Sequence, residues 1–297
     1  FPTRRSSDLN WKRANTGLKN MIVNALYLYN NNIFAATSNG IFRSSDKGES
    51  WDSSSSGLIN KNILSMTHYG DALYAGSYSN MVFRSIDHGA NWELFKGYLN
   101  SNIHCLAISD SVIYAGTKNG IYYTTIANDT NKWSILGLRD SYVGIEIFSL
   151  IVNKNTIYAG TNGMFYRSND LGKNWLKQQT GNLSALSILN FIQNGTDLYC
   201  ATYGTAGGVY KSLDSGYTWK RISDGFIDSS GWNRINCVAL FGNSLFAGCS
   251  GDGIYISNDD GALWNESNNG LDAILVTCLN KIRSEERRVG KECRSRW

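Results

Sequence analysis

The segment SSDKGESW (44–51) has a spacing of residues that returns four more times along the chain. The shared pattern is Ser-x-Asp-x-Gly-x-x-Trp, and its other copies are SIDHGANW (85–92), SNDLGKNW (168–175), SLDSGYTW (212–219) and SNDDGALW (257–264). A decayed copy, TTIANDTNKW (124–133), keeps the tryptophan. Five strict copies indicate an internal repeat, and a repeat decides the architecture before single elements are considered.

Tryptophans set the period of this repeat at 40 to 45 residues: Trp11, Trp51, Trp92, Trp133, Trp175, Trp219 and Trp264. Each period holds four short runs rich in Ile, Val, Tyr and Phe, such as NILSMTHY (62–69) and GIFRS (40–44). Runs of this length and composition, separated by Asn, Asp and Gly, are typical of β-strands. Asn-Gly pairs at 39–40, 119–120 and 162–163 favour tight hairpin turns.

Four strands in every repeat of this length predict an all-β fold, namely a β-propeller of four-stranded blades. Six modules run completely from one tryptophan to the next. Residues 10–18 have the pattern of the outer strand of a further blade, and 272–282 have the pattern of an inner strand. We therefore expect six complete blades plus parts of a seventh. A parent propeller of seven blades is the first interpretation, and a longer array is the alternative.

The pattern resembles the Asp-box, or bacterial neuraminidase repeat, which is shared by sialidases, xyloglucanases, sortilin-type receptors and the photosystem II assembly-factor family. The resemblance covers residues 10–282 and implies that each box is a turn between the third and fourth strands, away from the ligand face. The boxed residues are therefore expected to be structural: Ser44, Asp46, Gly48, Trp51, Ser85, Asp87, Gly89, Trp92, Ser168, Asp170, Gly172, Trp175, Ser212, Asp214, Gly216, Trp219, Ser257, Asp259, Gly261 and Trp264.

The two ends of the chain differ from the repeat. FPTRRSSDL (1–9) and RSEERRVGKECRSRW (283–297) can be translated from opposite strands of one DNA stretch, as expected for a sequencing adapter, and we set both aside. Eight of the 28 Lys and Arg and four of the 24 Asp and Glu lie there, so 10–282 carry 20 of each. A neutral chain without a basic stripe argues against nucleic acid as the main partner. No apolar run is long enough for a membrane span.

No sequence motif points to a metal or cofactor, and none is expected. His68, His88 and His104 lack ligand spacing, and no Cys-x-x-Cys, Gly-rich phosphate loop or Ser/His/Asp constellation occurs. The cysteines within 10–282 take positions where other repeats carry small residues, so we expect unbridged structural thiols. They are Cys105, Cys200, Cys237, Cys249 and Cys278.

Long connections in the fifth and sixth repeats predict a ligand site, because loops commonly carry binding residues. The segments are YGTAGG (203–208), GFIDSSGWNR (225–234) and SGDG (250–253), and their candidate residues are Tyr203, Asp228, Trp232, Arg234 and Asp252. A second rim, LRDSYVGIE (138–146), offers Arg139, Asp140, Tyr142 and Glu146. Aromatic residues beside Arg and Asp suit a sugar or a peptide. The alternative is that Trp232 covers a blade edge and the charges are solvated.

These observations favour a non-catalytic propeller that binds a protein or glycan. The resemblance implies an extracellular, periplasmic or cell-surface location. The alternative is a xyloglucanase-like or sialidase-like glycoside hydrolase whose catalytic partner region lies outside this chain. Residues 10–282 hold no proline, so the Phe-Arg-Ile-Pro segment of sialidases is missing. Their only glutamates are Glu49, Glu93, Glu146 and Glu266.

Overall fold

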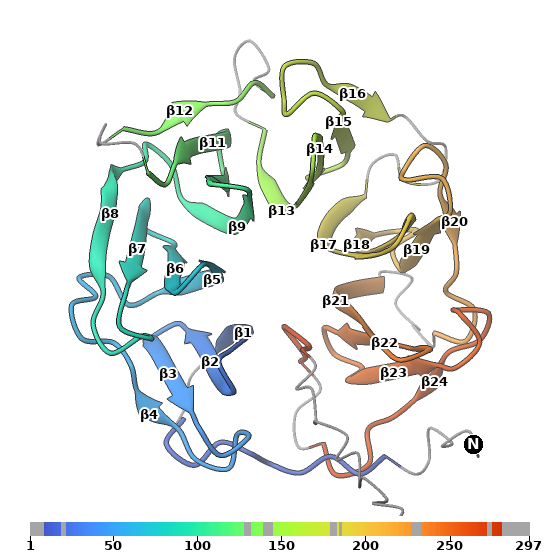
Figure 1. The fold of residues 1–297 in the computed structure, drawn as a ribbon. Helices are drawn as coiled ribbons and strands as arrows, with labels where there is room; N and C mark the ends of the chain where they lie inside the picture. The colour runs from blue at the N-terminus through green and yellow to red at the C-terminus, as the bar shows by residue number, and fades with distance from the viewer. Residues whose placement is uncertain are drawn as a thin grey trace, which may run out of the picture.

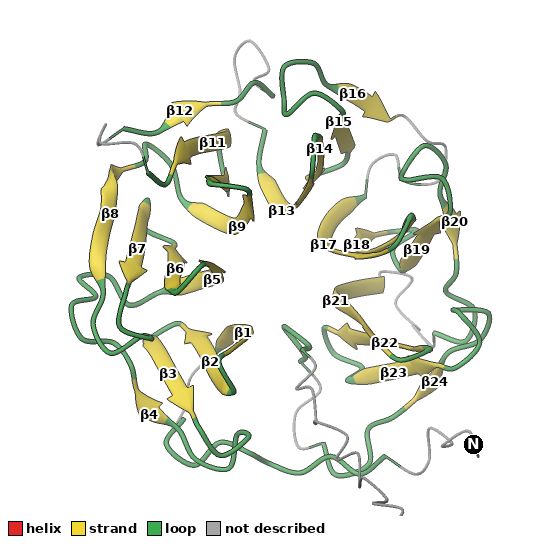
Figure 2. Ribbon diagram, viewed as in Figure 1, coloured by secondary structure: helices red, strands yellow, loops and turns green. Residues whose placement is uncertain are grey.

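The strands form a ring of six four-stranded blades around a common axis (Figure 1), which confirms the predicted β-propeller. The computed structural model describes residues 9–18, 22–127, 132–138, 145–178, 183, 186–226, 233–271 and 275–280. Those residues contain strands, turns and loops but no helix (Figure 2), and hence no helix long and apolar enough to cross a membrane.

Each blade consists of consecutive antiparallel strands, with the first nearest the axis and the fourth at the outside (Figure 1). Blade one comprises β1 (Val23–Tyr29), β2 (Asn32–Thr37), β3 (Gly40–Ser44) and β4 (Asp52–Ser53). Blade two comprises β5 (Ile63–Tyr69), β6 (Ala72–Ser77), β7 (Met81–Ser85) and β8 (Glu93–Tyr98). Blade three comprises β9 (Ile103–Ser109), β10 (Val112–Thr117), β11 (Gly120–Thr125) and β12 (Ser134–Ile135).

The other three blades repeat this order, and blades five and six are also joined through pairing of β18 with β21. Blade four comprises β13 (Ile147–Asn153), β14 (Thr156–Thr161), β15 (Phe165–Ser168) and β16 (Leu176–Gln178). Blade five comprises β17 (Ser187–Asn194), β18 (Asp197–Gly204), β19 (Val209–Ser212) and β20 (Lys220–Arg221). Blade six comprises β21 (Asn233–Phe241), β22 (Ser244–Cys249), β23 (Ile254–Ser257) and β24 (Asn265–Glu266).

The innermost strand of each blade has an irregularity at one equivalent position, which we call the bulge position. In β1 the pairing with β2 shifts between Val23 and Ala25, so Asn24 is the extra residue. A bulge re-aims a side chain relative to the alternation of the strand. Asn24 Nδ2 accordingly donates to the carbonyl of Ile63 in the next blade at 2.7 Å. The other bulge positions are Leu64, His104, Phe148, Leu189 and Asn236.

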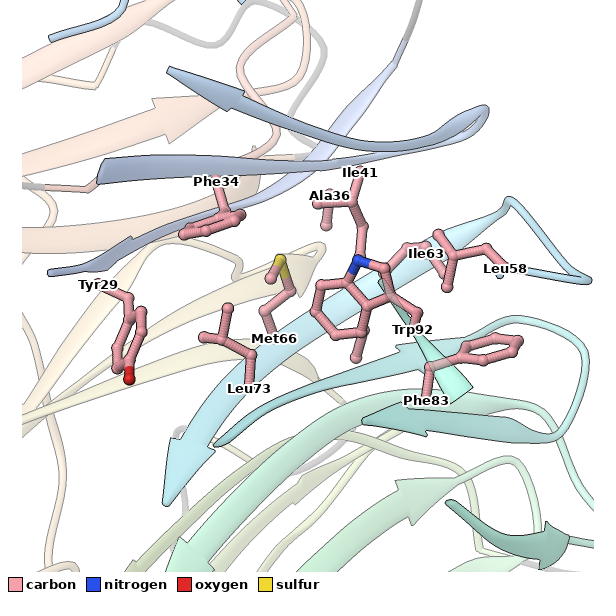
Figure 3. Close-up of a cluster of buried hydrophobic side chains, with 11 residues drawn as sticks. Tyr29, Phe34, Ala36, Ile41, Leu58, Ile63, Met66, Leu73, Phe83 and Trp92 are labelled. Carbon is pink, nitrogen blue, oxygen red and sulfur yellow. The ribbon is translucent and has the colours of Figure 1, made fainter. Parts of the chain in front are cut away.

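Apolar side chains fill the space between neighbouring blades. Figure 3 shows the cluster between blades one and two, where Phe34 and Ile41 of one blade meet Leu73, Phe83 and Trp92 of the other. Similar clusters join each of the following pairs of blades. Burial of an aliphatic or aromatic side chain contributes about 1.5–3 kcal/mol. Contacts between blades therefore supply much of the stability of the ring.

The Ser-x-Asp-x-Gly-x-x-Trp segments form identical turns between the third and fourth strands, here called box turns. In the first, Ser44 Oγ donates to Asp46 Oδ1 at 2.7 Å and accepts from the Gly48 amide at 2.8 Å. Asp46 also accepts from the Ser50 amide at 3.0 Å. The other four strict copies make the same three bonds. Lys47 (φ 64°) and Gly48 (φ 97°) both adopt left-handed backbone, which glycine tolerates without strain.

Two of the tryptophans that end box turns, Trp92 and Trp264, attach their blade to the preceding one through the indole N–H. The indole N–H of Trp92 donates to the carbonyl of Ser54 in blade one at 2.8 Å. Trp264 makes the equivalent bond to Ile222 in blade five at 2.6 Å. In both cases the acceptor lies three residues after the preceding tryptophan of the repeat. The box turn therefore positions a large side chain that joins two blades.

The same contact appears where the ring closes. The indole N–H of Trp11 donates to the carbonyl of Ser267, three residues after Trp264, at 2.6 Å. Residues 9–18 thus lie along the outside of the ring between blades six and one, while 275–280 lie near the axis between β21 and β1 (Figure 1). Parts of a seventh blade are present, as predicted.

Candidate functional site

The two ends of the ring carry different connections, because the strands of each blade are antiparallel. Box turns share one end with the turns between first and second strands. Turns between second and third strands, and connections into the next blade, emerge at the other end, here called the loop end. Tyr203 near the end of β18, Arg234 near the start of β21, and Asp252 between β22 and β23 all lie at the loop end.

Tyr203 and Arg234 are in direct contact at the junction of blades five and six. They are Cα partners where β18 pairs with β21, and the guanidinium carbon lies 5.3 Å from the centroid of the tyrosine ring. Arg234 is exposed, and Tyr203 is 36% exposed. At exposed sites such cation–π contacts contribute about 0.5–1 kcal/mol. The junction therefore presents a cation stacked on an aromatic ring to solvent.

The glycine-rich segment after Tyr203 forms the turn from β18 to β19. Gly208 has φ 151°, and a Cβ there would lie 2.3 Å from Ser223 Oγ, so a glycine is required. Thr202 Oγ1 donates to the carbonyl of Gly208 and accepts from its amide, both at 2.9 Å. The segment folds into a closed loop, and β18 continues to Gly204, beyond the last residue that it pairs with β19.

Asp252 lies in the adjoining turn of blade six. The amide of Ser250 donates to the carbonyl of Arg234 at 3.0 Å, which ties this turn to β21. Asn268 Nδ2 donates to the carbonyl of Asp252 at 2.9 Å, and the Asp252 side chain is exposed. The structure thus places Asp252 in the hairpin next to the Tyr203–Arg234 contact. The remaining candidates lie outside the described residues: Asp228, Trp232, Arg139, Asp140 and Tyr142.

A second polar pair at the loop end was missed by the sequence analysis. Nε2 of His104 in blade three lies 3.0 Å from Oε1 of Glu146, just before blade four. Burial lowers the pKa of His104, the Glu146 carboxylate acts in the opposite direction, and Lys118 lowers it further. His104 takes the bulge position that Asn24 and Asn236 use to reach the next blade. The polar residues at the bulge positions of three blades were the signal in the sequence that could have indicated this contact.

A cluster of rings at the box-turn end was also missed. The Tyr27 hydroxyl lies 2.6 Å from His68 Nδ1, and the Tyr29 ring centroid lies 5.2 Å from that of His68 and 6.0 Å from that of His88. Burial raises the pKa of Tyr27. No group of three or more His, Cys, Asp or Glu that could hold a metal occurs in the described part of the chain. We assign these rings to packing between blades one and two.

The glutamates that a glycosidase could use are distributed over the ring. Glu49 lies in a box turn of blade one, and Glu93 of blade two is 2.9 Å from Nε of Arg84. Glu146 faces His104, and Glu266 of blade six accepts from a tyrosine hydroxyl at 3.3 Å. Glycoside hydrolysis needs two carboxyl groups flanking one bond. These four glutamates lie in four different parts of the ring.

The cysteines are unbridged, as predicted from the small residues that other repeats carry at the same positions. Five described cysteines are free thiols: Cys105, Cys200, Cys237, Cys249 and Cys278. Burial raises the pKa of Cys105 to about 12 and that of Cys278 to about 11. A protonated thiol is a poor nucleophile and a poor metal ligand. The expectation of unbridged cysteines is confirmed for these residues.

Comparison with protein families identifies a partial match. The model of the DUF6242 β-propeller domain matches residues 98–226, which include blades three to five. No curated protein matches the chain.

Several solved structures share the fold. The extracellular domain of the one-component system BT4673 from B. thetaiotaomicron has a TM-score of 0.68 and 19% identity, covering 84% of this chain and 33% of that one. The GH74 xyloglucanase from Xanthomonas campestris has a TM-score of 0.66 and 17% identity, covering 82% and 45%. YCF48 from Cyanidioschyzon merolae has a TM-score of 0.61 and 17% identity, covering 82% and 84%. A structure of YCF48 bound to D1 peptide is also similar, with a TM-score of 0.61 and 15% identity over 80% and 78%.

The chain spans about a third of the BT4673 domain and less than half of the xyloglucanase. At these identities the likeness shows a common β-propeller fold.

Proposed function

We propose that the chain is a non-catalytic ligand-binding propeller of an extracellular or cell-surface protein, and that the loop end of blades five and six takes a protein or glycan. The observation that carries this proposal is the exposed guanidinium of Arg234 stacked on Tyr203. Use of the same fold in an extracellular domain, in a xyloglucanase and in a peptide-bound protein supports the proposed location and ligand classes.

The chemistry of the contact suits a ligand that carries a carboxylate. Arg234 Nε donates to Asn236 Oδ1 at 3.1 Å, which orients the guanidinium. A guanidinium binds a carboxylate through two parallel N–H groups. The exposed carboxylate of Asp252 in the adjoining turn can accept hydrogen bonds from sugar hydroxyls or peptide amides. The site therefore combines a cation, a ring and an acceptor, as ligand-binding loops do.

The test begins with the purified chain on a glycan array that includes sialosides and xyloglucan oligosaccharides, and on a peptide array. A bound probe is then titrated by calorimetry against wild type, Arg234→Ala and Tyr203→Ala. Each variant is expected to bind at least about tenfold more weakly, which corresponds to about 1.4 kcal/mol. The matched control is Arg84→Ala, which removes an arginine 5.6 Å from the Phe95 ring in blade two. The control is expected to bind normally.

Two outcomes would contradict the proposal. Equal affinity of wild type, Arg234→Ala and Tyr203→Ala for the probe would place the ligand elsewhere on the ring. Release of reducing sugar from xyloglucan, lost in Asp252→Asn, would make the protein a hydrolase rather than a binding module. Thermal melting of each variant by circular dichroism separates loss of a contact from loss of the fold.

A further inference from the structure

At the outside of the ring, residues 9–18 lie where the outer strand of a seventh blade would be. Trp11 binds the carbonyl of Ser267 in blade six, and the indole of Trp51 donates to the carbonyl of Ala14 at 2.9 Å. These are the same repeat positions that Trp92 uses to bind blade one. Residues 9–18 therefore bond to both neighbouring blades at the repeat positions that a fourth strand uses. They occupy the position of the outer strand of a seventh blade.

The inner part of a seventh blade is also present. Thr277 Oγ1 donates to the carbonyl of Val23 at 2.5 Å, just as Asn24 Nδ2 donates to Ile63 at 2.7 Å. Thr277 precedes Cys278 in the repeat as Asn24 precedes its aligned alanine, so it takes the bulge position. Residues 275–280 therefore lie at the inner strand of the seventh blade.

Between these two segments lies a cavity of about 750 Å³, here called the seam cavity. Its walls are predominantly apolar and come from blade six, blade one and both parts of the seventh blade. The principal lining residues are Leu18, Leu26, Ile33, Trp51, Ile254 and Val276. In every complete blade, the space between the first and fourth strands is filled by the second and third strands. The seam cavity is the equivalent space.

We propose that the seam cavity is a docking site for a two-stranded β-hairpin with the repeat's own pattern, which would complete the seventh blade. Strand addition supplies main-chain hydrogen bonds along an edge, and pockets for alternate side chains supply specificity. In blade one, Asp52 and Ser53 follow the tryptophan and pair with the third strand. Lys12 and Arg13 follow Trp11 in the same way, so they mark where the hairpin's second strand would pair.

The cavity has apolar walls from both blade six and blade one, so the hairpin must be apolar on both faces. The second strands of the complete blades have this property: in β10 every residue after Val112 is buried. A hairpin of the type found at residues 112–125 (VIYAGTKNGIYYTT) meets this requirement, because it forms β10 and β11 in blade three. This inference concerns the seam between blades six and one and is independent of the ligand proposed for blades five and six.

The experiment uses the full chain and a fluorescein-labelled synthetic peptide of residues 112–125. We expect saturable binding by fluorescence anisotropy, a higher melting temperature with peptide, and slower hydrogen exchange at residues 9–18 and 275–280. A peptide that binds only the folded state raises its stability by mass action. The control peptide has the same composition in a scrambled order that separates the apolar residues. It is expected not to bind.

Two protein variants locate the peptide. Leu275, which is 55% exposed and lines the seam cavity, is replaced by Asp, and Ile86, which is 69% exposed on a box turn, is replaced by Asp as the matched control. Leu275→Asp is expected to weaken binding at least tenfold, and Ile86→Asp to leave it unchanged. Ala14→Trp provides a second block from the exposed outer segment, in case Leu275→Asp alters folding.

The overturning results are equally specific. Absence of peptide binding, or equal binding of both peptides, would show that the seam cavity does not select a repeat-type hairpin. Equal binding by wild type, Leu275→Asp and Ala14→Trp would place the peptide elsewhere. Dimerisation by light scattering, with protection of 275–280 in the absence of peptide, would make a second copy of the chain the occupant and overturn the hairpin proposal.

Discussion

The indole N–H of Trp11 donates a 2.6 Å hydrogen bond to the carbonyl of Ser267, across 256 residues of sequence. On the other side, Trp51 donates to the carbonyl of Ala14 at 2.9 Å. Both bonds have the repeat spacing of the bond that Trp92 makes between blades one and two. The closure of the ring therefore uses the same contact that joins blades one and two and blades five and six.

Replacing Trp11 by phenylalanine should lower the free energy of unfolding by about 1–2 kcal/mol, because one hydrogen bond and part of a half-buried ring are lost. Trp92→Phe removes the equivalent bond inside the ring and serves as the comparison. Urea unfolding followed by circular dichroism measures both. An unchanged unfolding curve for Trp11→Phe, beside a weakened Trp92→Phe, would mean that the closing bond contributes no stability.

Gly57 allows the backbone of blade one to approach the tryptophan of blade two. It has φ 82°, and a Cβ there would lie 2.0 Å from the carbonyl oxygen of Trp92. Gly70 also has positive φ, at 55°, but no atom lies within 4 Å of its Cβ position. We expect Gly57→Ala to destabilise the protein by about 2 kcal/mol more than Gly70→Ala, because only the former adds a steric clash to the backbone strain. Similar melting temperatures for the two variants would refute this reading.

The box-turn aspartates should make the protein sensitive to acid. The pKa of Asp87 is lowered from 3.8 to about 2, mainly by the backbone and side chain of Asn91 and then by Ser85. Its folded pKa lies below its unfolded one, so its stabilising contribution is present above about pH 4 and is lost as the pH falls towards 2. Asp170 shows the same shift to about 2.

We therefore expect the free energy of unfolding to decrease between pH 4 and pH 2, and the double variant Asp87→Asn/Asp170→Asn to show a shallower decrease. Asp71→Asn, at an exposed carboxylate in the turn between β5 and β6, is the control and should keep the wild-type slope. Urea titrations at half-unit pH intervals provide the measurement. A double variant with the wild-type slope would exclude the box turns as the source of acid sensitivity.

The two charged neighbours of His104 should move its pKa in opposite directions. Burial lowers this pKa, Glu146 counteracts the effect, and Lys118 adds to it. Glu146→Gln is therefore expected to lower the pKa of His104 further, and Lys118→Gln to raise it. Because its folded pKa lies below the ordinary 6.5, the histidine destabilises the fold as the pH drops through 6.5. NMR titration of the imidazole Cε1–H resonance measures each variant, and shifts of the same sign in both would contradict the assignment.

Local chemistry explains why the blades could be predicted. A box turn closes its Ser–Asp–Gly hydrogen bonds within seven residues, so its pattern is visible in the sequence wherever it occurs. Its regular recurrence then places four strands in each interval. The loop-end location of Tyr203, Arg234 and Asp252 followed from the same repeat, since it depends only on which strands the insertions join.

The strand order, the blade repeat and the interruptions of the repeat could all be read from the sequence, because each depends on bonds between residues close in the chain. The contact of Arg234 with Tyr203, the pairing of His104 with Glu146, and the cavity between residues 9–18 and 275–280 became visible only in the folded ring. These contacts depend on the rotation between successive blades, added up over the whole ring. No pattern of neighbouring residues in the sequence encodes that total rotation.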